Sequence, residues 1–176
     1  MVKKKFIVNR NHLLGSHYVI KRQRLQDLGG GKIIMRDSSQ DYYPIGEKCL
    51  ILDTGGIFSG FILNSLDKCI TTPSVINEVK DEQSKNIVNM VINANKLAII
   101  RPENIFINKI KDEANKNKVY KLSDTDIDVL ALSIQLKEVC KEVYLVTDDY
   151  SIQKLALKLG IKIVKIKYKG IKELRK

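Results

Sequence analysis

From Cys49 onward, the chain alternates short apolar runs with stretches of helical periodicity, and this alternation constrains the fold more than any other feature. Four apolar runs predict buried strands, at Cys49–Leu52, Leu97–Ile100, Val143–Val146 and Ile161–Tyr168. Helices are predicted between them, at Gly56–Leu63, from Thr72-Pro73 onward, and at Glu103–Asn115, Ser123–Lys137 and Tyr150–Leu159. Because strands and helices alternate with short connections, the strands must pair in parallel. The sequence therefore predicts an α/β fold with a parallel sheet covered by helices on both faces.

Length and composition favour one globular domain. The chain has 176 residues, of which 44% are hydrophobic, enough for a core of its own. No apolar run approaches the roughly 20 residues that span a bilayer, and the basic start lacks the apolar stretch of a secretory signal. We therefore expect a soluble, cytoplasmic protein with no membrane partner.

The cysteines are few and scattered. Cys49, Cys69 and Cys140 form no Cys-x-x-Cys pair, and with only His12 and His17 they cannot assemble a zinc site of ordinary spacing. We interpret all three as small buried side chains that keep their thiols. That interpretation implies a reducing compartment.

Positive charge is concentrated ahead of the folded body. The net charge is +11, and residues Met1–Arg36 hold nine basic residues against one acidic residue, a net +8. Polyanions are natural partners of such a segment, because neutralised phosphates release their counterions. The alternative is a solvated tail that only aids solubility. We divide the chain into a basic arm (1–48), a folded domain (49–169) and a basic tail (170–176).

Little regular structure is expected within the arm. Two short strands are predicted, at Phe6–Val8 and Tyr18–Ile20. The consecutive glycines Gly29–Gly31 predict a turn or hinge, because glycines cost backbone entropy in a regular element.

Five acidic residues lie at the ends of predicted elements or on a neighbouring helix. Asp53 directly follows one strand, and Asp148 and Asp149 directly follow another. Asp126 lies in the first turn of the helix at 123–137, and Glu78 lies on the helix that begins at Thr72-Pro73. Ligands of open parallel sheets bind beyond the carboxyl ends of the strands. Carboxylates crowded there need a cation to offset their repulsion, and Mg²⁺ or Mn²⁺ prefers such oxygen ligands.

Each of these acids also has a purely structural interpretation. Asp53 and Asp149 could cap the helices that follow them. Asp126 could complete a capping box begun by Ser123. Glu78 could belong to an exposed ion pair with a nearby lysine, Lys80 or Lys85.

Two further acids are expected to stay outside any such site. Asp124 and Asp128 lie two positions on either side of Asp126, so we expect them to face away and be solvated. No Cys–His or Ser–His–Asp set is available elsewhere. Metal-assisted hydrolysis of a phosphodiester is therefore the enzyme chemistry that the composition supports.

Four ordered segments resemble the acidic motifs of PIN-domain nucleases, at Leu50–Phe58, Thr71–Val79, Leu122–Asp126 and Val146–Gln153. More narrowly, the sequence resembles the archaeal and eukaryotic Nob endonuclease family, which matures the 3′ end of small-subunit ribosomal RNA. The resemblance covers Cys49 to about Lys169. It implies a PIN-like fold with a five-stranded parallel sheet and helices on both faces.

The resemblance also implies which residues form the site. Asp53, Asp126 and Asp149 would bind Mg²⁺ or Mn²⁺, and Glu78 would bind metal or position water. In the family's Thr-x-Asp pattern Thr147 marks Asp149 as the ligand. Asp148 would then be an alternative ligand, or it would contact the ligands without binding the metal itself.

The activity implied is that of a metal-dependent endoribonuclease that cleaves single-stranded RNA in precursor ribosomal RNA. The family usually continues into a C-terminal zinc ribbon, whose cysteines this chain lacks, so the ribbon was lost or cut away, or the chain is a ribbonless relative. Two alternatives stay open: a VapC-like toxin ribonuclease, and a non-catalytic RNA-binding factor of ribosome assembly. The oligomeric state is not indicated by the sequence.

The charge of the arm generates a first prediction. Deleting Met1–Arg36 should weaken RNA binding and flatten its salt dependence, because log K falls with a slope of about 0.7 for each single-strand phosphate neutralised. Cleavage of a short oligonucleotide at saturating concentration should survive the deletion. Binding titrations at several salt concentrations measure the slope, and an unchanged slope would show that the arm is only a solvated tail.

Overall fold

A five-stranded parallel sheet forms the centre of the molecule. The computed structural model describes residues 18–20, 43–45, 48–119 and 121–166. The sheet has the strand order β5-β4-β3-β6-β7, and every neighbouring pair is parallel. Its strands are β3 (Lys48–Leu52), β4 (Cys69–Thr71), β5 (Leu97–Ile99), β6 (Glu142–Val146) and β7 (Lys162–Val164). The sheet and its strand count confirm the fold expected from the sequence.

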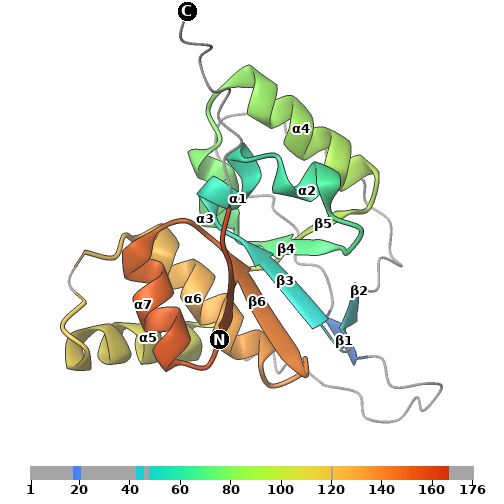
Figure 1. Ribbon diagram of the computed structural model, residues 1–176. Helices are drawn as coiled ribbons and strands as arrows, with labels where there is room; N and C mark the ends of the chain where they lie inside the picture. Colours follow the sequence, from blue (N-terminus) through green and yellow to red (C-terminus); the bar gives the residue numbers. More distant parts are fainter. Residues whose placement is uncertain (1–17, 21–42, 46–47, 120, 167–176) are drawn as a thin grey trace, which may run out of the picture.

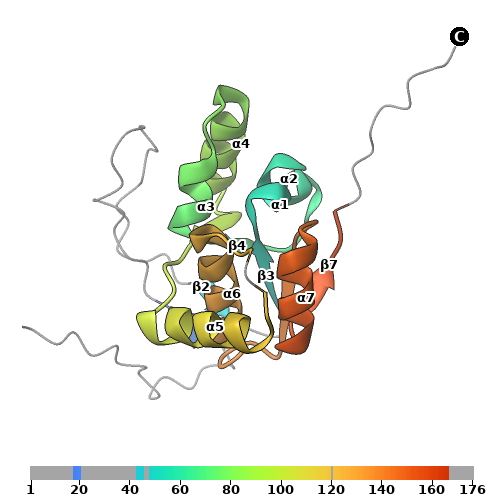
Figure 2. The ribbon, with the colours of Figure 1, turned by 90° about the vertical axis from the view of Figure 1, so that its left-hand side faces the viewer.

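Seven helices connect and cover the strands within the described residues: α1 (Thr54–Phe58), α2 (Phe61–Asn64), α3 (Pro73–Glu78), α4 (Glu82–Asn93), α5 (Asn104–Lys116), α6 (Asp124–Leu136) and α7 (Tyr150–Lys158). α5, α6 and α7 lie together on one side of the sheet, and α1, α2 and α4 lie toward the other (Figures 1 and 2). Among these helices, none has the length and apolar character that crossing a membrane requires.

The core lies between the central strands and α6. Ile51 and Leu52 of β3 and Leu145 of β6 are fully buried. The segment Val129–Leu132 of α6 is also completely buried, which confirms the prediction that this helix is enclosed by its neighbours. A helix apolar on nearly every side can be stable only in such a position.

The direction of the chain reverses between β3 and β6. From β3 the chain moves outward through β4 to β5, then returns to the other side of β3 as β6. The carboxyl ends of β3 and β6 are neighbours in register, with Leu52 opposite Val146. This reversal creates the crevice in which open α/β sheets bind ligands.

Three features of the domain differ from the sequence-based prediction. The helix expected at Gly56–Leu63 is split into α1 and α2, because Gly60 takes a left-handed backbone conformation with φ +67°. Strand β4 and helix α4 were not predicted at all. β4 has only three residues, and α4 is rich in polar residues but carries a buried apolar stripe, Val88, Val91 and Ile92, that the prediction overlooked.

Part of the arm is described. β1 (Tyr18–Ile20), which was predicted, pairs antiparallel with β2 (Tyr43–Ile45). The strand predicted at Phe6–Val8, the turn at Gly29–Gly31 and the tail at 170–176 lie outside the described residues. The division into arm, domain and tail therefore stays a prediction.

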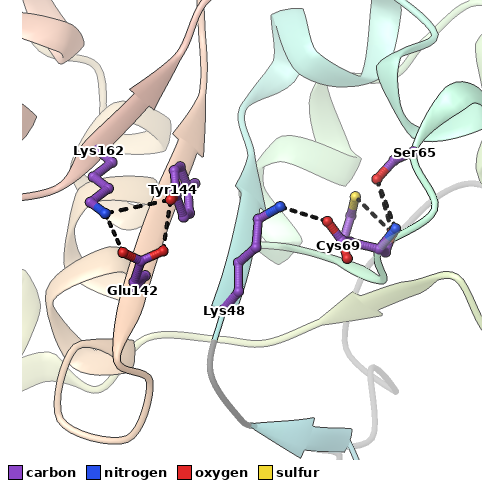
Figure 3. Close-up of polar contacts among 7 residues, drawn as sticks. Lys48, Ser65, Cys69, Glu142, Tyr144 and Lys162 are labelled. Atoms are coloured by element: carbon purple, nitrogen blue, oxygen red, sulfur yellow. Dashed lines mark hydrogen bonds and ion pairs between the residues drawn. The ribbon is translucent and has the colours of Figure 1, made fainter.

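Polar side chains connect the first residues of three strands. Glu142 of β6 accepts hydrogen bonds from Lys162 of β7 and from the Tyr144 hydroxyl, the latter at 2.7 Å (Figure 3). Lys48 of β3 pairs with Asp67 at 2.7 Å, and the ammonium groups of Lys48 and Lys162 lie 5.3 and 5.2 Å from the centre of the Tyr144 ring. These contacts align the strands at the edge opposite the crevice.

The expectation that all three cysteines keep their thiols is wrong for two of them. Cys49 of β3 forms a disulfide with Cys140, in the connection between α6 and β6, and both residues are buried. Cys69 is buried in β4 and keeps its thiol. The two half-cystines are 91 residues apart, a spacing from which no pairing can be deduced. The inference of a reducing compartment thus loses its support.

The disulfide generates a prediction about stability. Reduction should lower the free energy of unfolding by about 2–5 kcal/mol, because the bond closes a long loop in the unfolded chain. Thermal melts with and without dithiothreitol measure the loss. The matched control is the double variant Cys49→Ala/Cys140→Ala, whose melting temperature should not respond to the reductant. A parent protein equally indifferent to reductant would contradict the prediction.

Candidate active site

The five acidic residues singled out in the sequence lie on the wall of one cavity. The cavity measures about 220 Å³ and opens at the carboxyl ends of β3 and β6. Its lining residues are Asp53, Thr54, Gly55, Glu78, Ser123, Thr125, Asp126, Val129, Asp148, Asp149 and Ile152. The structure therefore brings together residues from the start of α1, the end of α3, the first turns of α6 and α7, and the connection after β6.

Asp53 is the most enclosed of the five, with 6% of its surface exposed. It is the N-cap of α1, where its Oδ1 accepts the Gly56 N–H at 2.6 Å. Burial raises the pKa of Asp53 to about 6, although hydrogen bonds from Thr147 and Gly56 favour the charged form. The nearby charge of Asp148 adds to the increase.

Asp126 both caps a helix and faces the cavity. The Ser123 hydroxyl accepts the Asp126 N–H at 3.1 Å, and Asp126 Oδ2 accepts the Ser123 N–H at 2.8 Å, which completes a capping box. Burial raises the pKa of Asp126, as do the charges of Asp149 and Glu78. The structural interpretation of Asp126 is thus correct, and it does not remove the carboxylate from the cavity.

Asp148 and Asp149 differ in how they are held. Asp149 is the N-cap of α7, and its Oδ1 accepts the N–H groups of Ser151 at 2.6 Å and Ile152 at 3.0 Å. The fully buried Thr147 fixes the turn, because its hydroxyl accepts the Asp149 N–H at 3.1 Å. Asp148 lines the cavity next to Gly55.

Glu78 is held by a hydroxyl rather than by a lysine. α3 begins at Pro73, with Thr72 as its N-cap as predicted, and its last residue is Glu78. Glu78 Oε2 accepts a hydrogen bond from the Thr54 hydroxyl. The ion pair considered for Glu78 is not formed with Lys85, which pairs with Glu82. Sequence reasoning overlooked Thr54, although its place directly after Asp53 at a strand end was an available signal.

The two acids expected to be solvated behave differently. Asp124 is exposed in the first turn of α6, as predicted. Asp128 does not line the cavity, but it is half-buried, and its Oδ2 accepts a hydrogen bond from the Ser74 hydroxyl at 2.8 Å. This bond joins α6 to α3 and so fixes the helix of Glu78 against the helix of Asp126. The prediction that Asp128 is solvated was wrong, because helical geometry alone does not show what packs against an outward face.

Gly55 leaves room between two carboxylates. A Cβ at this position would lie 2.8 Å from Asp148 Oδ1 and 3.4 Å from Asp53 Oδ1, so a side chain would intrude between them. Glycine in the first turn of a helix costs stability, and here it preserves an open space faced by oxygen atoms. Carboxylate oxygens around a small open space fit a hard divalent cation.

Among the described residues, no three acidic, histidine or cysteine side chains lie close enough to enclose an ion together. Mg²⁺ does not require such a cage, because it keeps several waters and takes one or two carboxylates plus substrate phosphates. The donor set therefore fits a cation shared between protein, water and substrate. Asp53, Asp126 and Asp149 would hold it, with Glu78 and Asp148 beside them.

Comparison with known proteins places this site in a family. Residues 50–136 match the family described as "PIN domain of ribonuclease". A protein of Aeropyrum pernix named "Ribonuclease VapC3" is 32% identical over 137 residues, which cover 77% of this chain and 99% of that protein. The chain belongs to the PIN-domain ribonuclease family. The matched range contains three of the five cavity carboxylates, those of Asp53, Glu78 and Asp126, and ends before Asp148 and Asp149.

Other relatives of this PIN-domain protein carry a different name. "Endoribonuclease Nob1" of Pyrococcus abyssi is 34% identical over 128 residues, which cover 72% of this chain and 73% of that protein. The "20S-pre-rRNA D-site endonuclease nob1" of Schizosaccharomyces pombe is 37% identical over 91 residues, or 50% of this chain and 23% of that protein. The resemblance to the Nob family noted in the sequence is therefore confirmed.

The buried Asp53 generates a prediction about pH and stability. Between pH 4 and 6 the folded state keeps a proton that the unfolded state has released, so the free energy of unfolding should fall as pH rises. Asp53→Asn can still accept the Gly56 N–H and has no charge to bury. It should therefore stabilise the metal-free protein at pH 7 by up to about 3 kcal/mol.

Denaturant unfolding at pH 4 and pH 7 measures this effect as a difference between variant and parent. The difference should be near zero at pH 4 and grow toward pH 7. Asp124→Asn is the matched control, because it removes a carboxylate of the same region that is exposed rather than buried. A gain for Asp53→Asn that is equal at both pH values would contradict the role of the buried charge.

Proposed function

We propose that this protein is a Mg²⁺- or Mn²⁺-dependent endoribonuclease that cleaves single-stranded RNA. The observation that carries the proposal is the gathering of five carboxylates on one cavity in a chain of net charge +11. Like charges gather at a cost unless a cation offsets them in the working protein. Membership in the PIN-domain ribonuclease family supports the same activity.

The side chains of the cavity have distinct tasks under this proposal. Asp53, Asp126 and Asp149 hold the cation, and Glu78, oriented by the Thr54 hydroxyl, binds it or positions the attacking water. When bound, the cation supplies Lewis acidity and positive charge for the developing phosphate. Among the described lining residues there is no histidine, cysteine or lysine, so proton transfer at the cavity falls to carboxylates and water.

We further propose that the substrate is precursor small-subunit ribosomal RNA, cut at its 3′ end, in the cytoplasm. The names of the Nob1 relatives support this choice, since one of them is an endonuclease of 20S pre-rRNA. The net charge of +8 on residues Met1–Arg36 suits a large, structured polyanion.

A VapC-like toxin ribonuclease is the second candidate, and one observation favours it. The alignment with VapC3 covers 99% of that protein, whereas the alignment with the Pyrococcus Nob1 covers 73% of that one. Both candidates use the same carboxylates, so substrate preference distinguishes them. A toxin would cleave RNAs unrelated to the ribosomal precursor, whereas a maturation nuclease would prefer the precursor over unrelated RNA. A non-catalytic RNA-binding assembly factor would cleave neither.

Asp126→Asn tests the proposed chemistry directly. Asparagine can keep the capping bond to Ser123 but lacks the charge that a hard cation needs. Metal-free stability should hold or rise, because a repulsive charge has left the cavity. Cleavage of single-stranded RNA in Mg²⁺ or Mn²⁺ should fall by orders of magnitude, and chelation should abolish the parent's activity. Mn²⁺ should raise the melting temperature of the parent and not of the variant.

The control is Asp124→Asn on the same helix turn, since Asp124 is exposed and absent from the cavity wall. It should leave cleavage and the response to Mn²⁺ unchanged. Asp128→Asn is less suitable, because it alters the bond to Ser74. Normal cleavage by Asp126→Asn at several Mg²⁺ concentrations would contradict the proposed mechanism. A parent protein that binds RNA but does not cleave it would favour the non-catalytic assembly factor.

A further inference from the structure

Tyr150 is an exposed aromatic residue that directly follows Asp149 of the cavity wall. Tyr150 is the first residue of α7, and 78% of its surface is exposed. It lies in the chain between Asp149 and Ile152, both of which line the cavity. The ring contributes nothing to the core, whose residues from this helix are Ile152, Leu155 and Ala156.

The same outward face of α7 carries a lysine one turn away. Lys154 follows Tyr150 by four residues, a spacing that places both side chains on one face of a helix. Lys154 is exposed. α7 lies on the outside of the fold (Figure 2), and both Tyr150 and Lys154 are exposed on it. A chain leaving the cavity over α7 therefore meets an aromatic ring and then a cation.

The surroundings of the ring favour a nucleobase over a protein surface. Asp148 and Asp149, which precede Tyr150, are exposed carboxylates, and Lys154 is charged. The same face also carries Leu157, which is 62% exposed, but Lys154 and the two carboxylates separate it from the ring, so no contiguous apolar centre of the kind a protein interface needs is formed. A single exposed ring flanked by a cation is the arrangement on which bases of single-stranded nucleic acid stack.

We propose that Tyr150 is a substrate-positioning residue that stacks on the base of a nucleotide next to the scissile phosphate. Lys154 contacts a phosphate of the same strand beyond that base. The inference rests on the proposed ribonuclease function, and it adds a residue that selects for unpaired bases, because a base inside a duplex has no free face to offer.

A tryptophan at this position reports stacking directly. The chain contains no tryptophan, so Tyr150→Trp introduces a single fluorophore that can still stack. Single-stranded RNA added in EDTA, which prevents metal-dependent cleavage, should quench its fluorescence. An abasic site scanned along the RNA should remove the quenching at one position. Leu66→Trp is the matched control: Leu66 is fully exposed in the connection before β4, at the opposite edge of the sheet, and should not be quenched.

Affinity measurements complete the test. Tyr150→Ala should weaken binding of the same RNA by about 5- to 150-fold, the range that loss of one stacked base gives. Tyr150→Phe, which keeps the ring, should bind within about twofold of the parent. The abasic site that weakens binding to the parent should have no further effect on Tyr150→Ala. Lys154→Ala should reduce the salt dependence of binding in a Tyr150-containing protein.

Several outcomes would overturn the inference. These are parental affinity in Tyr150→Ala, an equal loss in Tyr150→Phe, or an abasic effect that persists without the ring. A change of oligomeric state in Tyr150→Ala would assign the ring to a protein contact instead. The proposed function fails separately, because cleavage that survives Asp126→Asn contradicts it whatever Tyr150 does.

Discussion

Backbone N–H groups at the starts of three helices hold the acidic side chains of this protein in place. Gly56 of α1 donates to Asp53, Ser123 at the start of α6 donates to Asp126, and Ser151 of α7 donates to Asp149. The positive ends of three helix dipoles therefore meet at one cavity. Without them, the mutual repulsion of the carboxylates would act unopposed in the metal-free protein. The topology of the sheet brings two of these helix starts together, because α1 and α7 directly follow the neighbouring strands β3 and β6.

Capping and metal binding are compatible tasks for one carboxylate. The backbone bonds of Asp126 use Oδ2, and those of Asp149 use Oδ1, so each side chain keeps its second oxygen for another partner. From the sequence, helix capping and metal binding were treated as alternatives for each acid, but the two roles do not exclude each other. A cap fixes the side chain in advance, and a ligand that is already fixed loses less entropy when it binds.

Most elements of the domain could be predicted from the sequence, including the polar α5, whereas β4 and α4 could not. β3, β6 and α6 were placed within about one residue because each contains an unbroken or nearly unbroken apolar run. β4 was missed because its apolar run is only Cys69 and Ile70, whereas the equally short β5 belongs to a run of four apolar residues. The cavity residues were found through their position at strand ends. The bond between Ser74 and Asp128, and that between Thr54 and Glu78, depend on how α3 packs, which no local pattern encodes.

The disulfide and the cavity lie at opposite ends of the same strand. Cys49 is the second residue of β3 and Asp53 follows its last, about 13 Å away along an extended chain. A covalent bond therefore crosslinks one end of the sheet, whereas carboxylates that repel one another lie at the other end. Local opening should therefore be less frequent at the disulfide end of β3 than at the cavity end. Amide hydrogen exchange should be slow near Cys49 and faster where β3 meets α1. The more readily opened end of the sheet would then be the one at which the proposed RNA substrate binds.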